Sequence, residues 1–319
     1  MTARLDVALV ERGFARSRRH AQTLIAAGRV RVGPAPVSRA ATRVGDDTPL
    51  RVVADPTDPD YVSRAAYKLA GALDAWAYRP GSGPDVAGRH CLDVGASTGG
   101  FTDVLLRRGA RRVVAVDVGH GQLDARLAAD PRVELREGVN ARDLAPGDVD
   151  PAPGLVVADL SFVSLRLVLG PVASVAAPGA DLVVLVKPQF EVGRAALGSG
   201  GVVRDAAARR RAVAGVLTVA ENLGLAARGL VASTLPGPAG NLEYPLWLTR
   251  GPADGVPHGD LLAAVFGNAV LDNMVLDNTE TGDAVLDDVV PDDALLDSAA
   301  LLDSAAFDGA ALNSAAGAR

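Results

Sequence analysis

The stretch CLDVGASTGGFTD, residues 91–103, runs from an apolar segment through a glycine-rich turn into a helical pattern. Asp93 lies near the end of the apolar segment, and Gly95, Gly99 and Gly100 follow it. In an open α/β sheet, nucleotide-like ligands bind where a strand gives way to a helix, and glycines there let the backbone approach the ligand. The stretch therefore predicts the first strand of a Rossmann-like sheet, with a ligand-binding loop at its carboxyl end.

Strand-like and helical runs alternate after this point. The pairs are HCLDV (90–94) with GGFTDVLLRRG (99–109), RRVVAVD (111–117) with GQLDARLAAD (121–130), LVVADL (155–160) with SLRLVLGPVASV (164–175), and DLVVLVK (181–187) with a helix over about 205–223. This alternation predicts an α/β fold with a parallel sheet wrapped by helices. Two late runs, GLVASTL (229–235) and EYPLWLT (243–249), are expected to complete the sheet.

The two strand-end aspartates indicate the kind of ligand. Asp93 is placed to hold an ammonium group, and Asp117, at the end of the next strand, is placed to accept ribose hydroxyls. The glycine spacing is not the dinucleotide pattern G-x-G-x-x-G. S-adenosylmethionine carries both an ammonium group and a ribose, whereas a nicotinamide dinucleotide has no such ammonium. Ordinary strand-end capping by the two aspartates is the alternative.

Charge is distributed unevenly along the chain. The whole sequence has a formal net charge of −6. Residues 270–319 contain ten Asp and one Glu against a single Arg, or 1 − 11 = −10, whereas residues 1–51 contain ten Arg against four acidic residues, or 10 − 4 = +6. A basic N-terminal segment of this kind is typical of a protein that contacts nucleic acid.

The basic N-terminal segment, residues 1–51, has the pattern of a small α+β domain. Two short helical runs, at 4–13 and after a capping Ser17, precede a turn-rich alternating segment. This arrangement resembles the small RNA-binding module first known from a small-subunit ribosomal protein; a generic arginine-rich helical hairpin with a solvated face is the alternative. The arginines expected to contact RNA are Arg4, Arg16, Arg18, Arg19, Arg29 and Arg31.

Lysine is rare in this chain. Of 32 Lys and Arg residues only Lys68 and Lys187 are lysine, which leaves 32 − 2 = 30 arginines. Arginine stays charged, whereas a buried lysine can give up its proton. The two lysines are therefore candidates for chemistry that a guanidinium cannot perform, unless their scarcity is only compositional.

Several classes of protein are disfavoured by the remaining composition. The single cysteine, Cys91, excludes an internal disulfide framework and is typical of a reducing, cytoplasmic location. The sequence shows no secretory leader, and the apolar stretch 154–186 is interrupted by charged residues, so we expect no membrane partner. His20, His90 and His120 are scattered without ligand spacing, so we expect no metal.

Two segments are expected to lie outside the folded domains. Residues 52–60, VVADPTDPD, have the composition of a linker. Residues 269–319 form an acidic low-complexity tail of pentads such as LDSAA, and we predict that this tail is disordered, with a short solenoid as the alternative. The domain that carries the chemistry is then residues 61–268.

Several motifs in order resemble the TlyA family of FtsJ-like ribose 2'-O-methyltransferases. They are YVSRAAYKL (61–69), DVGASTGGFTDVLL (93–106), AVDVGHGQLD (115–124), NARDL (140–144), DLSFVSL (159–165), VKPQFEVG (186–193), GGVVRD (200–205) and PGPAGNLEYPLWL (236–248). Two features depart from the family pattern: SRAAYKL stands where a sequence closer to SRGGLKL is usual, and the acidic tail is additional.

The resemblance implies a function and a set of site residues. It implies methyl transfer from S-adenosylmethionine to cytidine 2'-hydroxyls of rRNA in both ribosomal subunits. The family's catalytic tetrad falls on Lys68, Asp159, Lys187 and Glu243. The residues expected to bind the cofactor are Asp93, Gly95, Ser97, Gly99, Gly100, Phe101, Asp117, Asn140, Asp143 and Phe162.

The four tetrad residues have different expected roles. Lys187 is expected to accept the hydroxyl proton, with Lys68 as a nearby cation and the two acids orienting the lysines and the sugar. Phe162 is expected to pack on the cofactor or the target nucleoside, or alternatively in the core.

Other functions remain as alternatives. A non-catalytic RNA-binding or ribosome-assembly factor would have a broken tetrad, and a membrane-active haemolysin would need an export signal and an inserting segment. A nicotinamide dehydrogenase is disfavoured by the glycine spacing. The sequence predicts no oligomeric state.

Overall fold

The computed structural model describes residues 2–53, 55, 59–77, 83–193, 197–198, 200–251 and 255–267. The chain divides into two compact units, Met1–Val62 and Ser63–Arg319. The acidic tail predicted for residues 269–319 lies outside the described residues, as does part of the expected linker at 52–60.

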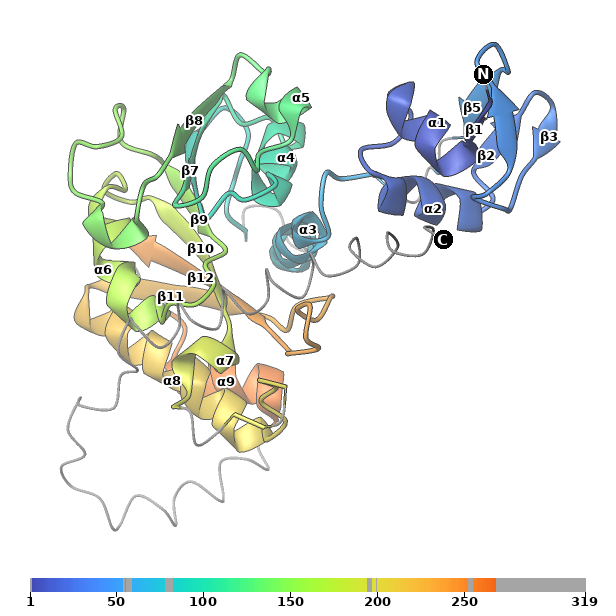
Figure 1. Cartoon of the computed structure of the whole chain (residues 1–319). Helices are drawn as coiled ribbons and strands as arrows, with labels where there is room; N and C mark the ends of the chain where they lie inside the picture. Colours follow the sequence, from blue (N-terminus) through green and yellow to red (C-terminus); the bar gives the residue numbers. More distant parts are fainter. Residues whose placement is uncertain are drawn as a thin grey trace, which may run out of the picture. The chain divides into compact units, whose positions relative to one another are not determined.

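The N-terminal unit is a small α+β fold (Figure 1). Its elements in chain order are β1 (Thr2–Arg4), α1 (Leu5–Glu11), α2 (Arg18–Ala26), β2 (Val30–Val32), β3 (Ala35–Pro36), β4 (Arg43–Gly45) and β5 (Leu50–Val52). β1 pairs with β4, and β2 lies between β3 and β5 in a second antiparallel sheet.

Local sequence signals explain where the second helix begins and ends. The Ser17 side chain accepts a hydrogen bond from the His20 amide, as expected of an N-cap, and Gly28 follows the helix with a positive φ of 69°. The apolar faces of α1 and α2 meet in one core with β2 and β4, represented by Leu9, Ile25 and Val30, each 1 % exposed or less.

The C-terminal unit is built on a seven-stranded sheet with the order β11-β12-β10-β9-β6-β7-β8 (Figure 1). The strands are β6 (His90–Val94), β7 (Arg112–Asp117), β8 (Val133–Glu137), β9 (Leu155–Ala158), β10 (Asp181–Val186), β11 (Leu225–Leu230) and β12 (Tyr244–Arg250). The five strands from β10 to β8 in this order are parallel, and β12 runs antiparallel to both of its neighbours.

Helices cover both faces of this sheet. They are α3 (Ala65–Trp76), α4 (Gly100–Arg107), α5 (Ala125–Ala128), the 3₁₀ turn η1 (Ala141–Asp143), α6 (Leu165–Ser174), α7 (Pro188–Glu191), α8 (Ala206–Asn222) and α9 (His258–Phe266). α6, α8 and α9 share a core with alternate strand residues such as Leu92, Val156 and Leu182, whereas α4 packs with α3. Because strand side chains alternate between faces, one apolar strand can serve both helix layers. The predicted α/β, Rossmann-like class is confirmed.

Two details of the sheet differ from the sequence prediction. The strand expected at 229–235 begins four residues earlier and ends at Leu230, because Gly224 ends the preceding helix with a φ of 70° and the chain extends at once. The sheet is also not wholly parallel. The chain returns from β11 to β12 without a crossover helix, so these two strands pair antiparallel.

The helix expected over 121–130 is much shorter in the structure, at Ala125–Ala128. Asp124 caps its start by accepting a hydrogen bond from the Arg126 amide. Pro131 disfavours helical geometry at Asp130, so the helix ends before it.

Candidate functional site

A cavity of about 250 Å³ lies at the carboxyl ends of β6, β9 and β10. The strand after β6 is added on one side of the central pair and the strand after β9 on the other, so the strand order reverses between β6 and β9. Open α/β sheets bind ligands at such a switch point. The cavity is lined by Ser63, Arg64, Ala65, Lys68, Gly95, Ala96, Ser97, Thr98, Gly100, Phe101, Asp159, Ser161, Lys187, Pro236 and Pro238.

Lys187 and Asp159 form the first ion pair of the site. β9 and β10 are adjacent parallel strands, so the residues just beyond their carboxyl ends lie close together. The Lys187 Nζ is 2.8 Å from Asp159 Oδ1 and donates a hydrogen bond of 2.8 Å to Ser161 Oγ. Lys187 is 7 % exposed, so its amine is held by two oxygens in a nearly dry position.

Lys68 and Glu243 form the second ion pair. Lys68 lies on α3 and Glu243 directly precedes β12, and their Nζ and Oε2 atoms are 2.5 Å apart. Glu243 is 1 % exposed and is not among the residues lining the cavity, whereas Lys68 lines it. Glu243 therefore binds Lys68 from a buried position outside the cavity, and Lys68 contributes to the cavity wall.

The glycine turn after β6 brings backbone close to the cavity. Gly95 has a φ of 82°, and a Cβ there would lie 2.7 Å from the Asp159 carbonyl oxygen. At Gly100 a Cβ would lie 2.9 Å from the Ala66 amide nitrogen. These glycines allow the turn to pack against both the β9 loop and the start of α3. The approach of this backbone to a ligand stays a prediction.

We expect Gly95→Ala to weaken binding of S-adenosylmethionine roughly 10- to 100-fold, from ~1–3 kcal/mol of strain and displacement of the Asp159 backbone. Calorimetric titration with S-adenosylmethionine measures the effect. Gly147→Ala is the matched control, because Gly147 also has a positive φ, of 96°, but a Cβ there has no atom within 4 Å. Equal affinities for the Gly95→Ala variant and the wild type would show that the turn does not shape the ligand site.

Asp93 is buried beneath the turn and does not line the cavity. It is 0 % exposed, its Oδ2 accepts a hydrogen bond of 2.7 Å from Thr102, and its Oδ1 has no hydrogen-bond partner within the described part of the chain. Burial raises the pKa of this carboxyl to about 7, while the Thr102 hydroxyl opposes the shift. An unpartnered carboxylate oxygen below a glycine turn fits a ligand that brings a hydrogen-bond donor.

Asp117 organises the neighbouring loop. Its two carboxylate oxygens accept hydrogen bonds of 2.7 Å from the Ser97 and Gly119 amides. Each oxygen keeps a second lone pair that could accept a ribose hydroxyl. Asn140 accepts a hydrogen bond from the Arg142 amide and thereby starts the 3₁₀ turn that contains Asp143, and neither residue lines the cavity.

The two aromatic residues predicted at the site differ in exposure. Phe101 lines the cavity and is 4 % exposed. Phe162 is 39 % exposed, has a positive φ of 63°, and its ring centroid lies 5.3 Å from that of Phe190. The alternative that Phe162 packs in the core is therefore wrong. A left-handed backbone at a bulky residue is a strained arrangement that occurs most often at functional sites.

Known proteins match both units of the chain. The FtsJ-like methyltransferase family matches residues 61–250, and the S4 domain family matches residues 3–48. The 16S/23S rRNA (cytidine-2'-O)-methyltransferase TlyA of Mycobacterium tuberculosis is 54 % identical over 246 residues, which cover 77 % of this chain and 89 % of the relative. The chain belongs to the TlyA family of FtsJ-like methyltransferases.

A further relative and a solved structure that are similar to this chain are both called hemolysins. Hemolysin A of Brachyspira hyodysenteriae is 36 % identical over 76 % of this chain and 97 % of the relative. A solved structure described as a suspected hemolysin of Streptococcus thermophilus has a TM-score of 0.61 and 31 % identity, over 88 % of this chain and 99 % of that one. In the described part of the chain, no helix is both long and apolar enough to cross a membrane.

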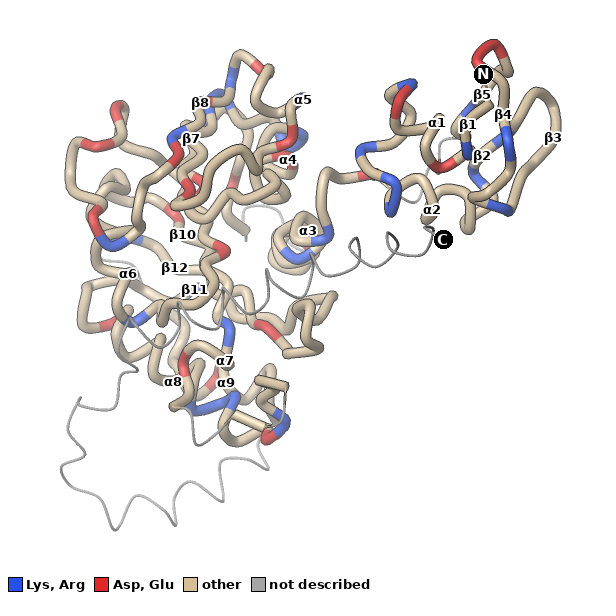
Figure 2. The backbone as a smooth tube through the Cα atoms, in the orientation of Figure 1, with Lys and Arg blue, Asp and Glu red and all other residues tan. Residues whose placement is uncertain are grey.

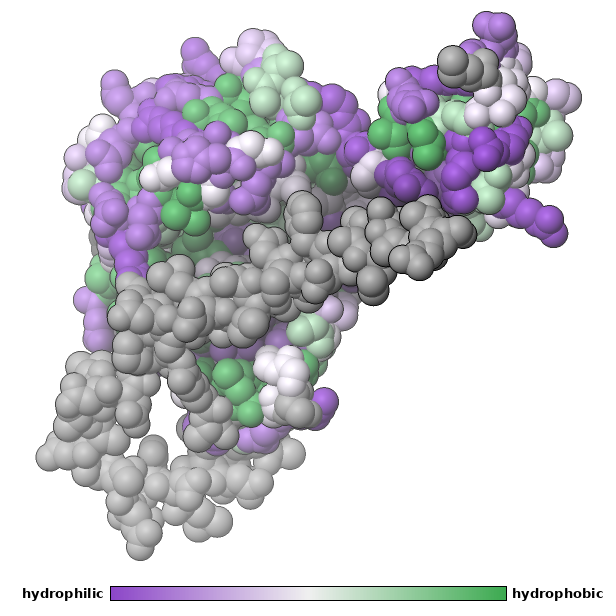
Figure 3. Space-filling model, viewed as in Figure 1, coloured by the Kyte–Doolittle hydropathy of each residue, from purple (hydrophilic) through white to green (hydrophobic). Residues whose placement is uncertain are grey.

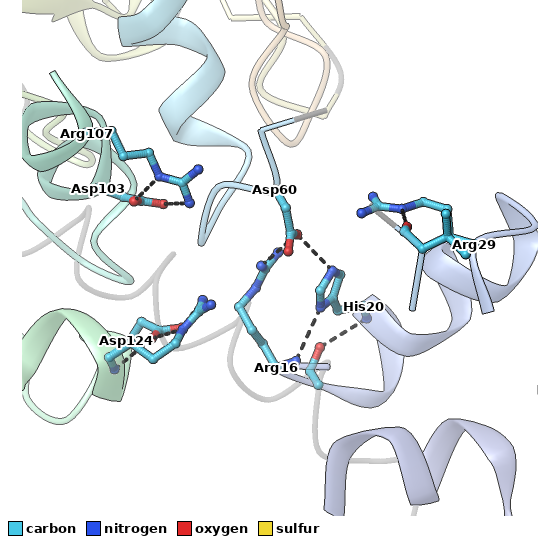
Figure 4. Close-up of polar contacts among 10 residues, drawn as sticks. Arg16, His20, Arg29, Asp60, Asp103, Arg107 and Asp124 are labelled. Atoms are coloured by element: carbon cyan, nitrogen blue, oxygen red, sulfur yellow. Dashed lines mark hydrogen bonds and ion pairs between the residues drawn. The ribbon is translucent and has the colours of Figure 1, made fainter. Parts of the chain in front are cut away.

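The basic residues of the S4 domain lie on several of its elements (Figure 2). Much of the visible face of this unit is hydrophilic (Figure 3). Arg18 and Arg19 are exposed on α2, and Arg31 is half-buried on β2. Several of the arginines predicted to contact RNA have partners within the unit. Arg18 donates to Asp6, Arg16 lies 3.0 Å from Asp60, and Arg29 donates to the Val53 carbonyl oxygen (Figure 4).

A buried acid organises part of this basic surface. Asp6 is 0 % exposed, and its carboxylate accepts hydrogen bonds from Arg4, Arg18 and Gln22. The Arg4 guanidinium, helped by Gln22 and Arg18, holds the pKa of the Asp6 carboxyl well below its usual range despite its burial. One carboxylate thus fixes two arginines that come from β1 and α2.

We expect Asp6→Asn to lower the melting temperature of the protein at pH 7, and this difference from the wild type should shrink with acidification. The folded-state pKa of Asp6 is depressed, so its stabilising effect is complete above the unfolded value of about 4 and is lost progressively at lower pH. Thermal unfolding followed by circular dichroism between pH 7 and pH 2 tests this. Asp74→Asn is the control, since Asp74 pairs with Arg108 but is 71 % exposed. A pH-independent difference for Asp6→Asn would contradict the assignment.

Polar residues with a structural role that were not predicted from the sequence include Ser161, Asp181, Asn241 and Glu191. Ser161 holds Lys187, and Asp181 accepts hydrogen bonds from the Trp247 ring nitrogen and from Arg89. Asn241 ties the 200–203 segment to the loop before Glu243 through Val203 and Gly201. Glu191 is buried beside α6. Each lies within or beside a motif quoted above, but no spacing rule distinguishes it from a solvated residue.

The described residues contain no group of three or more His, Cys, Asp or Glu side chains placed to hold a metal ion.

Proposed function

We propose that this protein transfers a methyl group from S-adenosylmethionine to the ribose 2'-hydroxyl of cytidines in the rRNA of the small and large ribosomal subunits. The observation that carries the proposal is the pair of lysine–carboxylate contacts, Lys187 with Asp159 and Lys68 with Glu243, at one cavity on an FtsJ-like sheet. The activity named for the 54 % identical relative agrees with this chemistry.

The cavity and its surroundings fit the cofactor. Asp93, whose Oδ1 is unpartnered below the turn, would meet an ammonium group that enters beside it, and Asp117 would accept ribose hydroxyls. Gly95, Gly99 and Gly100 would keep the turn tightly packed beside the ligand. Ser97 and Phe101 would complete the cofactor wall, while Asn140, Asp143 and Phe162 would lie toward the base or the target nucleoside. S-adenosylmethionine supplies an electrophilic methyl group on a sulfonium centre.

Lys187 is assigned the proton transfer. A ribose hydroxyl is a weak nucleophile until its proton is drawn off, and a general base must lie within about 2.6–3.2 Å of that proton's oxygen. The Lys187 Nζ faces the cavity in a position fixed by Asp159 and Ser161. Lys187 would accept the hydroxyl proton, while Lys68, held by Glu243, would supply a donor to the hydroxyl oxygen and orient it.

The two units would divide the work. Residues 1–51 would bind rRNA through the arginines of the S4 domain, residues 52–60 would link the units, and residues 61–268 would hold the cofactor and perform the transfer. Because the substrate is a ribosomal subunit, the protein would act in the cytoplasm. A non-catalytic assembly factor needs no such pairing of both lysines with acids beside a cavity.

Tritiated methyl transfer to purified ribosomal subunits, prepared from cells that lack this enzyme, tests the proposal. We expect label in rRNA that depends on S-adenosylmethionine and on Lys187. Binding of subunits with no incorporation of label would favour the assembly factor and contradict the proposal.

A further inference from the structure

Glu191 is a buried acid outside the cavity, and the catalytic roles proposed above do not use it. It lies at the end of α7, and its side chain is 1 % exposed. Its carboxylate accepts hydrogen bonds from Ser164 Oγ at 2.6 Å, from the Leu165 amide at 2.7 Å and from Arg166 Nε at 3.3 Å. All three donors belong to the start of α6, so Glu191 joins α7 to that helix.

The two joined elements are the ones that follow the catalytic loops. α7 begins directly after Lys187, and α6 follows the segment that carries Asp159 and Ser161. The two segments also meet at the Phe162 and Phe190 rings, whose centroids are 5.3 Å apart. Contacts therefore join the two segments near Lys187, at the aromatic pair and at Glu191. Neither the aromatic pair nor Glu191 is among the residues that line the cavity.

The burial of Glu191 has an energetic cost. Burial raises the pKa of its carboxyl, and the hydrogen bonds from Ser164, Leu165 and Arg166 only oppose that effect. A buried carboxylate often stabilises a fold no more than apolar side chains of similar volume would. Its hydrogen bonds, however, are directional, so they can fix the geometry of the elements they join. The Glu191 carboxylate accepts hydrogen bonds from the Leu165 amide of α6 and from the side chain of Ser164, the N-cap of that helix. These two bonds fix both the position and the rotation of α7.

The segment between the catalytic acid and α6 needs such support. Phe162 has a positive φ of 63°, and a bulky residue holds that conformation only where the surrounding structure imposes it. β9 fixes the start of the segment, where the Asp159 amide bonds to the Val94 carbonyl oxygen. Glu191 fixes its end at Ser164 and Leu165.

We propose that Glu191 is a positioning residue for methyl transfer: its carboxylate holds α7 against the start of α6 and thereby sets the Lys187 Nζ relative to Asp159 and Ser161. The inference rests on the proposed function. A displacement of about 1 Å at a reacting group can cost ~10²-fold in rate, so the effect of losing Glu191 is expected in turnover and not in binding.

The test compares the full-length variants Glu191→Ala and Glu191→Gln with the wild type. We expect Glu191→Ala to lower kcat for tritiated methyl transfer by roughly 10- to 100-fold, while KM for subunits and calorimetric affinity for S-adenosylmethionine stay within about twofold. Glu191→Gln should recover part of the loss, because an amide oxygen can still accept from the Leu165 amide. Glu221→Gln on α8 is the matched control, since Glu221 is 72 % exposed.

A second measurement distinguishes positioning from general stability. In a Lys187→Arg background, Glu191→Gln should cause little further loss of kcat, because residues that act through one group are not additive. Wild-type kcat in Glu191→Ala, or full additivity with Lys187→Arg, would overturn the positioning role. The proposed function fails separately, through absence of methyl transfer by the wild type.

Discussion

Replacing Lys187 by arginine is expected to lower turnover of methyl transfer by roughly 10²- to 10⁴-fold, the range typical of a lost general base. Arginine keeps the positive charge opposite Asp159 but cannot accept a proton, because its pKa stays above about 12. Affinity for S-adenosylmethionine should change little, since the cofactor is assigned to the β6 and β7 loops.

Calorimetry measures the affinity, and tritiated methyl transfer to purified subunits measures the turnover. Arg108→Lys, the reverse substitution at the C-cap of α4, is the control and should be close to silent. If Lys187→Arg turned over within a few-fold of the wild type, Lys187 would serve only as a charge, and the scarcity of lysine in this chain would be a matter of composition.

Neutralising Arg18, Arg19 and Arg31 together, each to glutamine, is expected to weaken binding to ribosomal subunits by roughly 10- to 100-fold at low salt. Each arginine that contacts a phosphate releases counterions on binding. The slope of log affinity against log salt should therefore become shallower by about 2 to 3 units, while affinity for S-adenosylmethionine is retained.

The matched control removes the same charge from the other unit. Arg112, Arg132 and Arg136 lie on or beside β7 and β8 and pair with nearby acids. Their triple replacement by glutamine should leave subunit affinity within a few-fold of the wild type. Equal losses in the two triple variants would show that RNA binding follows net charge and not the S4 domain.

Most of the sheet could be predicted from the sequence because its inner strands are buried on both faces. The DLVVLV run of β10 is buried at every position, and such continuous apolar runs bounded by turns are typical of parallel strands. The placement of β11 was wrong because its residues, Leu225 to Leu230, include Ala226, Ala227 and Arg228, which have no strand pattern of their own. Pairing with β12 and the bulge near Gly229 determine that strand.

The candidate site was predictable only in part. The Asp159 and Lys187 pairing follows from adjacent parallel strands. The Lys68 and Glu243 pairing joins residues 175 positions apart, and only the family resemblance placed them together. Glu191 and Asn241 could not be predicted, because a lone acid or amide acquires its role from the surfaces that meet around it.

The most direct test of the account is a map of the methylated nucleosides. Ribosomal subunits from cells lacking this enzyme would be incubated with the purified protein and S-adenosylmethionine, and their rRNA would be digested and analysed by mass spectrometry. We expect new 2'-O-methylcytidine in rRNA of both subunits with the wild type and almost none with Lys187→Arg. Methylation on a base, or no new methyl group with the wild type, would contradict the assignment of Lys68 and Lys187 to methyl transfer at a ribose hydroxyl.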